Sequence, residues 1–278
     1  MGWGKHVEWF QRRYINGKPF QNRAMTLYLI GLGLGDDRDL TLRGLETAKM
    51  CTKIYLECYT SLHPESDKEK LEQRIGKNIL LADRTTVEQQ TEKLLDAAKS
   101  GNAALLVVGD PLFATTHTDL LMRARSLGIA VQVIHNASVF AAVAQTGLQP
   151  YKFGKITSIP FPEKNFHPTG FFEVLKQNLS IEAHTLFLLD LRPSEKRFLT
   201  IAQAIELLLE IVHEKKDAAI SGKTMAIGCA RLGSANQKIV YATLDELQKM
   251  EFGTAPYCLI IPAKLHFAEE EFLGHYAS

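Results

Sequence analysis

Residues 103–117 read Ala-Ala-Leu-Leu-Val-Val-Gly-Asp-Pro-Leu-Phe-Ala-Thr-Thr-His. The apolar run at the start is typical of a strand that is buried on both faces of a sheet. The run breaks at Gly109-Asp110-Pro111, because glycine permits unusual backbone angles and proline cannot continue a ladder. A helical pattern then begins at Ala114 and extends to about Leu127. Ligands of open α/β sheets bind beyond the carboxyl end of such a strand. Asp110 is therefore a candidate site residue, although an aspartate is also a common turn former.

The chain opens with a strand–helix–strand pattern. Residues 26–30 predict a buried strand, which the glycine-rich turn 31–35 follows. A helix capped by Asp39 or Thr41 comes next, and residues 53–59 predict a second strand. Further strands over 78–82 and 130–135, with helices over 86–100 and 139–145, complete the pattern. Such alternation is typical of a mostly parallel sheet, so we expect an N-terminal α/β domain over residues 25–150.

The second half of the chain predicts another α/β domain. Four prolines between residues 150 and 168 indicate a linker region over 151–170. Residues 171–278 then form the expected C-terminal domain, with a mixed sheet because residues 237–243 alternate like an edge or antiparallel strand. The other expected elements are helices over 171–179, 200–216 and 244–250 and strands over 185–191, 223–231 and 257–262.

Composition narrows the possible functions. The 278 residues are 46% hydrophobic and 23% charged, with a net charge of +1, as in a soluble globular protein without the basic excess of a nucleic-acid or membrane binder. The four cysteines have no CxxC spacing, which favours free thiols, no metal site and a cytoplasmic protein. Residues 1–24 lack the apolar region of a signal peptide; we expect an extension outside the core, either helical or disordered, before a start at Met25.

The turn 31–35 invites comparison with a dinucleotide site, because Glu57 follows at a suitable distance. The spacing is GxGxG and not GxGxxG. Asp36, Asp37 and Asp39 also stand where a pyrophosphate would need bare amides, and their charge would repel it. The glycines instead predict a close backbone approach to a ligand or to a neighbouring strand.

The sequence contains no GxSxG elbow, Walker loop or HExxH motif, and no pair of carboxylates stands out for acid–base work. What remains is a set of strand-end turns that combine Asp110 and Ser138 with apolar residues such as Leu34, Phe113 and Val139. This mixture suits an amphipathic small molecule that is held in a mostly apolar cleft. Ser138 and His135 could equally be a helix cap and a structural histidine.

Several segments, in order from Met25 almost to the C-terminus, resemble the diphthine synthases, a family of tetrapyrrole-methylase-like S-adenosylmethionine-dependent methyltransferases. The segments that carry the resemblance are residues 27–36 (LYLIGLGLGD), 55–61 (YLECYTS), 107–117 (VVGDPLFATTH), 133–138 (VIHNAS), 148–154 (LQPYKFG), 184–190 (HTLFLLD), 230–233 (ARLG) and 237–239 (QKI). Residues 1–24 match nothing in the family.

The resemblance implies a homodimer of two-domain protomers, with S-adenosylmethionine bound in the cleft between the domains. The family's histidine contact before the closing strand is replaced here by Tyr257. The implied donor contacts are Leu34, Asp110, Phe113, Ser138, Val139, Leu189, Leu232 and Tyr257.

The implied reaction is successive methylation of the amino group on the modified histidine (3-amino-3-carboxypropyl-histidine) of translation elongation factor 2, in diphthamide biosynthesis. No residue is identified as its base, and water could serve. The compact segment 191–200 favours three methyl groups over a fourth that would form a methyl ester. The alternatives are a precorrin- or uroporphyrinogen-type methylase, a dinucleotide-dependent oxidoreductase, and a non-catalytic module that docks on the elongation factor.

Overall fold

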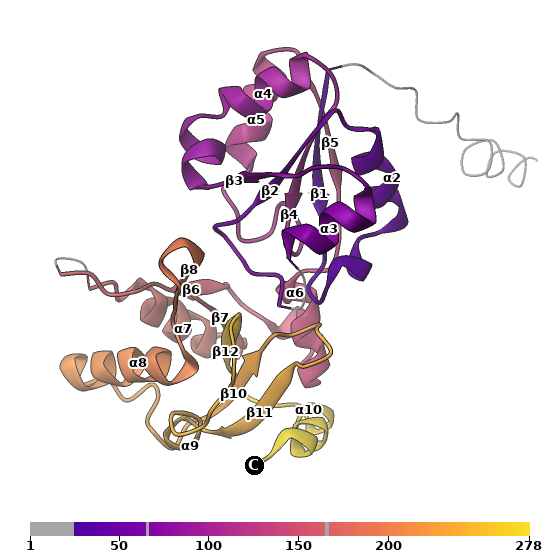
Figure 1. The fold of residues 1–278 in the computed structure, drawn as a ribbon. Helices are drawn as coiled ribbons and strands as arrows, with labels where there is room; N and C mark the ends of the chain where they lie inside the picture. The colour runs from indigo at the N-terminus through magenta and orange to yellow at the C-terminus, as the bar shows by residue number, and fades with distance from the viewer. Residues whose placement is uncertain (1–24, 65–66, 165–166) are drawn as a thin grey trace, which may run out of the picture.

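The computed structural model describes residues 25–64, 67–164 and 167–278, and this part of the chain contains two five-stranded sheets, each with helices on both faces (Figure 1). The expectation for residues 1–24 lies outside the described residues. The first sheet has the strand order β3-β2-β4-β1-β5, and every pairing in it is parallel. Its strands are β1 (Thr26–Gly31), β2 (Lys53–Glu57), β3 (Leu80–Ala82), β4 (Ala103–Val107) and β5 (Ala130–Ile134).

Alternation along β1 explains how helices come to cover both faces of this sheet. Leu27 and Leu29 pack in the cluster that contains residues of α4 and α5. Tyr28 and Ile30 point the other way, into a cluster with Leu71 of α3. Both sets are buried, as expected for a central parallel strand. The helices are α2 (Leu42–Met50), α3 (Lys68–Ile75), α4 (Glu92–Lys99) and α5 (Thr118–Ser126).

The glycine-rich turn after β1 lies directly against the turn after β4. Gly33 and Gly109 exchange backbone hydrogen bonds of 2.8 and 3.3 Å, and both have φ near +80°. A Cβ at Gly31 would lie 2.7 Å from the Gly109 carbonyl oxygen. The glycines therefore serve a close approach between two turns of the chain, which is one of the two alternatives that the sequence left open.

The second sheet is mixed, with the order β11-β10-β12-β7-β6. The β6–β7 pair is parallel and the other three pairs are antiparallel, and β11 is an edge strand as its alternation predicted. A hairpin, β8 (Leu191–Arg192) with β9 (Arg197–Phe198), follows β7. The strands of the sheet are β6 (Thr157–Ile159), β7 (Thr185–Leu189), β10 (Met225–Ala230), β11 (Lys238–Thr243) and β12 (Tyr257–Ile261).

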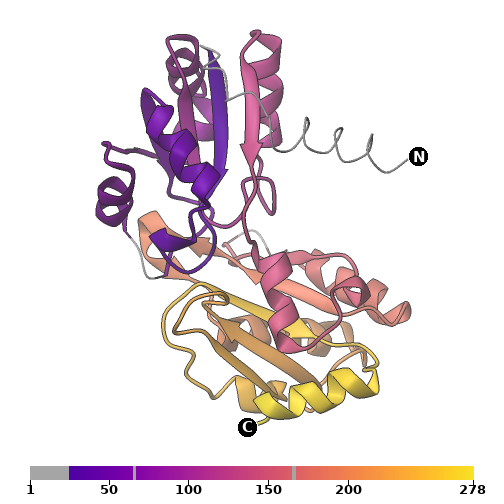
Figure 2. The ribbon, with the colours of Figure 1, turned by 90° about the vertical axis from the view of Figure 1, so that its right-hand side faces the viewer.

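Both faces of the second sheet are covered as well (Figures 1 and 2). One face packs against α7, α8 and α9. Helix α8 begins after Thr200, which forms a capping box with Gln203. The other face packs against the segment that follows β5 and against α10. The helices are α6 (Val139–Ala142), α7 (Gly170–Ser180), α8 (Ile201–Lys215), α9 (Leu244–Leu247) and α10 (Phe267–Leu273).

Three expectations about elements need correction, and two observed elements had not been expected. Helix α5 begins at Thr118 and not at Ala114, which has a φ of +55° that no helix tolerates. The helix expected over 86–100 is divided into a π-turn, Thr85–Gln89, and α4. The expected linker 151–170 contributes β6 to the second sheet, so it is not a linker throughout. Helix α10 and the β8–β9 hairpin were not expected.

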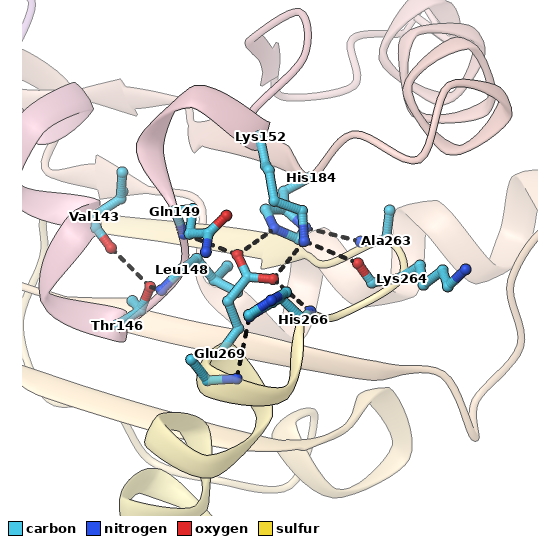
Figure 3. Close-up of polar contacts among 11 residues, drawn as sticks. Val143, Thr146, Leu148, Gln149, Lys152, His184, Ala263, Lys264, His266 and Glu269 are labelled. Atoms are coloured by element: carbon cyan, nitrogen blue, oxygen red, sulfur yellow. Dashed lines mark hydrogen bonds and ion pairs between the residues drawn. The ribbon is translucent and has the colours of Figure 1, made fainter.

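A buried ionic network ties α10 to the rest of the second domain (Figure 3). The Glu269 carboxylate accepts hydrogen bonds from the backbone amides of Gln149 and His266, at 2.9 and 2.8 Å, and from Lys152. It also contacts Nε2 of His184 at 3.1 Å, while Nδ1 of that ring accepts from the Ala263 amide at 3.0 Å. This ring is therefore neutral, with its proton on Nε2.

Candidate active site

A cavity of about 320 Å³ lies between the carboxyl ends of the first sheet's strands and the strand ends of the second sheet. This is where a ligand of an open α/β sheet is expected. Its size is at the lower end of the range for small-molecule sites. All eight residues that the resemblance implied as donor contacts line it: Leu34, Asp110, Phe113, Ser138, Val139, Leu189, Leu232 and Tyr257.

Asp110 links the turn after β4 to the turn after β5. Its side chain is only 3% exposed. One carboxylate oxygen accepts from the Leu112 amide at 3.0 Å, and the other accepts from the Asn136 amide at 3.2 Å and contacts Nδ1 of His135 at 2.8 Å. A carboxylate can accept about four hydrogen bonds, so one position remains for a ligand.

Ser138 begins α6, as the sequence predicted, but its hydroxyl does not cap the helix. Among the described residues this hydroxyl makes no hydrogen bond, although the residue is only 7% exposed. Beside it, the rings of Phe113 and Phe140 pack with their centroids 5.1 Å apart. The arrangement offers an unused polar group next to an aromatic wall, which suits an amphipathic ligand.

The turn after β1 is closed to a pyrophosphate. The Asp39 carboxylate accepts hydrogen bonds from the backbone amides of Leu34 and Gly35, at 3.2 and 2.7 Å. Amides in this position would hold the phosphates of a dinucleotide. Thr41, and not Asp39, caps α2 by accepting from the Gly44 amide. Asp39 thus counts against a dinucleotide for a more direct reason than charge repulsion alone, because it already occupies the amides of Leu34 and Gly35.

The second domain supplies the other wall of the cavity through Leu189, Leu232 and Tyr257. The Tyr257 hydroxyl donates a hydrogen bond to the Gly253 carbonyl, and burial raises the pKa of this phenol. Arg231, with a φ of +53°, holds the loop before β12 in place. Its guanidinium donates to the carbonyls of Phe252 and Thr254 and to Asn236.

The structure adds lining residues that sequence reasoning did not place in the site. Tyr59, Thr60 and Ser61 follow β2, and they lie within one of the segments that carried the resemblance. Arg84 follows β3 and had no signal, because a single arginine after a short strand resembles any surface residue. Cys229 of β10 and Cys258 of β12 also line the cavity, as free thiols that lie opposite each other on the two neighbouring strands. Their spacing along the chain could not show this arrangement.

Within residues 25–64, 67–164 and 167–278, no three His, Cys, Asp or Glu side chains gather into a group that could hold a metal ion. No helix in the described part of the chain is long and apolar enough to cross a membrane.

Comparison with known proteins defines the class first. Residues 26–248 match the family model of tetrapyrrole (corrin/porphyrin) methylases. The chain is 45% identical to the diphthine synthase of Methanocaldococcus jannaschii, over 90% of this chain and 98% of that one. It is 41% identical to the diphthine methyl ester synthase of Schizosaccharomyces pombe, over 90% and 94%. A crystal structure from Entamoeba histolytica, assigned as a diphthine synthase, superposes with a TM-score of 0.85 and 39% identity, over 91% of this chain and 99% of that one.

The fold is therefore that of a tetrapyrrole-methylase-type methyltransferase. Within that class, the chain belongs to the diphthine synthase family of S-adenosylmethionine-dependent methyltransferases.

Proposed function

We propose that this protein transfers methyl groups from S-adenosylmethionine to the amino group of 3-amino-3-carboxypropyl-histidine in translation elongation factor 2. The observation that carries the proposal is that eight residues from distant parts of the chain, each matched to a donor contact of the family, line one cavity. The family's name supplies the acceptor, and the cavity supplies a place where donor and acceptor can meet.

The residues present fit the donor. Ser138, a residue that is only 7% exposed, offers a hydroxyl that caps no helix, and Asp110 retains room for a hydrogen bond from a ligand. Leu34, Val139 and Leu232 surround them with apolar surface. An amphipathic nucleoside with an amino-acid tail needs this combination of a few fixed polar groups and apolar walls.

The donor supplies an activated methyl group, so the protein's task is alignment rather than activation. The amine nitrogen forms a bond to the methyl carbon, and the carbon–sulfur bond breaks with its electron pair moving to sulfur. The residues around the cavity must hold the two reactants in line and exclude water, which can lower the barrier by several kcal/mol. The amine must be neutral to attack, and the proton that it loses between transfers can pass to water.

The intact mass of elongation factor 2 tests this proposal. Factor that carries the unmethylated precursor is incubated with the protein and S-adenosylmethionine. We expect the mass to rise in methyl increments, with three if only the amine is methylated and a fourth if the carboxylate becomes an ester. The compact segment 191–200, which contains the short β8–β9 hairpin, favours three methyl groups. Unchanged mass, with S-adenosylhomocysteine still bound, would show that the acceptor is a different molecule.

The assembly and the location of the protein are part of the same proposal. We infer that the protein acts as a homodimer in the cytoplasm, where elongation factor 2 is found, and that it needs neither nucleic acid nor a membrane. Support for the dimer comes from the family resemblance alone. Light scattering coupled to size-exclusion chromatography tests it: the mass of a single 31.1 kDa chain at micromolar concentration would exclude the dimer.

A further inference from the structure

The cavity has two sides that come from different strands of the first sheet. Five of the eight residues that we expect to contact the donor follow β1, β4 and β5, at the centre and one edge of the sheet, and the other three, Leu189, Leu232 and Tyr257, come from the second domain. The opposite side follows β2 and β3, at the other edge, and includes Tyr59, Thr60, Ser61, Leu62 and Arg84. None of these five is among the residues matched to donor contacts.

Arg84 brings to the lining a guanidinium that makes no hydrogen bond within the described protein and only a long ion pair with Glu88. Among the described residues, only Arg84 and Arg231 bring a positive charge to the cavity wall. The guanidinium of Arg231 is already engaged with three backbone carbonyls. That of Arg84 makes no hydrogen bond to the described protein, and its nearest carboxylate oxygen, on Glu88, lies 4.0 Å away. Thr116 holds the same Glu88 oxygen by a 2.8 Å hydrogen bond.

The Arg84 guanidinium contacts an aromatic ring, a contact that leaves its N–H donors unused. Its central carbon lies 5.3 Å from the centroid of the Tyr59 ring, which acts as a platform for the cation. The Arg84 side chain is 69% exposed, so a ligand can reach it from solvent. A planar guanidinium with free N–H groups is the side chain best suited to a carboxylate, because it can form two parallel hydrogen bonds.

We propose that Arg84 binds the carboxylate of the acceptor side chain and so positions the amine for methyl transfer. This inference rests on the proposed function. The acceptor bears its carboxylate and its amine on the same carbon, so a clamp on one fixes the position of the other. Arg84 is thus a positioning residue for the acceptor, while the turns after β1, β4 and β5 hold the donor.

The donor also has a carboxylate, so the experiment must separate the two sources. Arg84→Gln removes the charge, Arg84→Lys keeps the charge but loses the planar fork, and Arg123→Gln is a matched control. Arg123 is a half-exposed arginine on α5 that pairs with Asp119 and does not line the cavity. Initial rates of the first methyl transfer give KM and kcat for the factor, and calorimetry gives the Kd for S-adenosylhomocysteine.

We expect Arg84→Gln to raise the KM for elongation factor 2 by about tenfold or more, the effect of losing a charged hydrogen-bonded pair. Its Kd for S-adenosylhomocysteine should stay within about twofold of the wild type, since the donor side is untouched. Arg84→Lys should recover part of the loss, and Arg123→Gln should behave as the wild type. A purely structural role would change melting temperature and donor affinity together.

Two results would overturn the assignment while leaving the proposed function intact. One is an unchanged KM in Arg84→Gln. The other is a loss of S-adenosylhomocysteine affinity of about tenfold, which would show that Arg84 holds the carboxylate of the donor. A wild-type protein that transfers no methyl group to the factor would refute the proposed function, and this inference with it.

Discussion

Asp110 offers the sharpest test of how the site is built, because the structure gives it a role beyond ligand contact. Its carboxylate joins two turns through the amides of Leu112 and Asn136. Replacing it with alanine would leave both amides without this acceptor in a partly buried place. Each orphaned donor costs about 1–3 kcal/mol. Two such donors would cost about 2–6 kcal/mol, and because both amides are only partly buried we expect Asp110→Ala to lower the free energy of unfolding by about 2–4 kcal/mol, the lower part of that range.

In a chain of this size such a loss lowers Tm by about 5–10 °C, which thermal unfolding followed by circular dichroism can measure. Asp110→Asn should lose about half as much, because its amide oxygen can still accept on one side while its NH₂ group faces the other donor. Both variants should lose affinity for S-adenosylhomocysteine, which calorimetry measures well below the lowered Tm.

Ser138→Ala is the matched control for the loss of stability expected in Asp110→Ala. It removes a buried polar group from the same cavity without breaking a hydrogen bond in the described protein. Its Tm should stay close to that of the wild type, while its donor affinity falls. If Asp110→Ala melted like the wild type, the reasoning that this carboxylate holds the two turns together would be refuted, and direct ligand contact would be its only role.

Three other expectations follow from the structure. Acid should destabilise the protein in two steps, measured as denaturation midpoints across pH. Burial lowers the pKa of His184 more than Glu269 raises it. The unfolded chain therefore takes up a proton at His184 before the folded protein does, and stability falls as the pH drops below about 6.5. His184→Gln should remove this step. Burial raises the pKa of Glu269, but four hydrogen bonds to its carboxylate outweigh this effect and hold the pKa at about 2. The free energy of unfolding therefore falls again below about pH 4.5. The loss from this second step amounts to about 3 kcal/mol once Glu269 is fully protonated. Tyr257→Phe keeps the aromatic ring at the cavity and loses only the hydrogen bond to Gly253, so the affinity for S-adenosylhomocysteine should fall by less than about tenfold. Tyr257→Ala also removes the ring, so its loss of affinity should be greater than about tenfold. Cys229 should resist thiol reagents at neutral pH until the protein unfolds, because its hydrogen bond with Cys258 and its burial raise the thiol pKa.

The sequence predicted most of the fold because the central strands carry a strong signal. Residues 103–108 are a continuous apolar run, and β4 lies in the middle of the first sheet with every residue buried. The alternation over 237–243 likewise predicted the edge strand β11. Such patterns reflect burial, which the sheet and its helices impose on each successive residue.

Predictions were wrong where burial did not determine the backbone. Ala114 and its neighbours have the composition of a helix start, yet the positive φ of Ala114 moves the start of α5 to Thr118. Prolines between residues 150 and 168 suggested a linker, yet β6 needs only three residues to pair with β7. Short strands and turns depend on contacts from distant parts of the chain, and these leave little trace in local composition.

The candidate site also combines parts that the sequence could predict with parts that it could not. Its donor side lies on turns after β1, β4 and β5, whose glycines and aspartates are held by hydrogen bonds between the turns and therefore follow recognisable motifs. The opposite side lies after the short strands β2 and β3, where Arg84 is exposed and free of hydrogen bonds to the described protein. A small donor needs a rigid, enclosed place, whereas an acceptor attached to a large protein must enter from an open edge. Arg84, the lining residue that carried no signal in the sequence, thus lies on the side of the cavity that a protein substrate can reach.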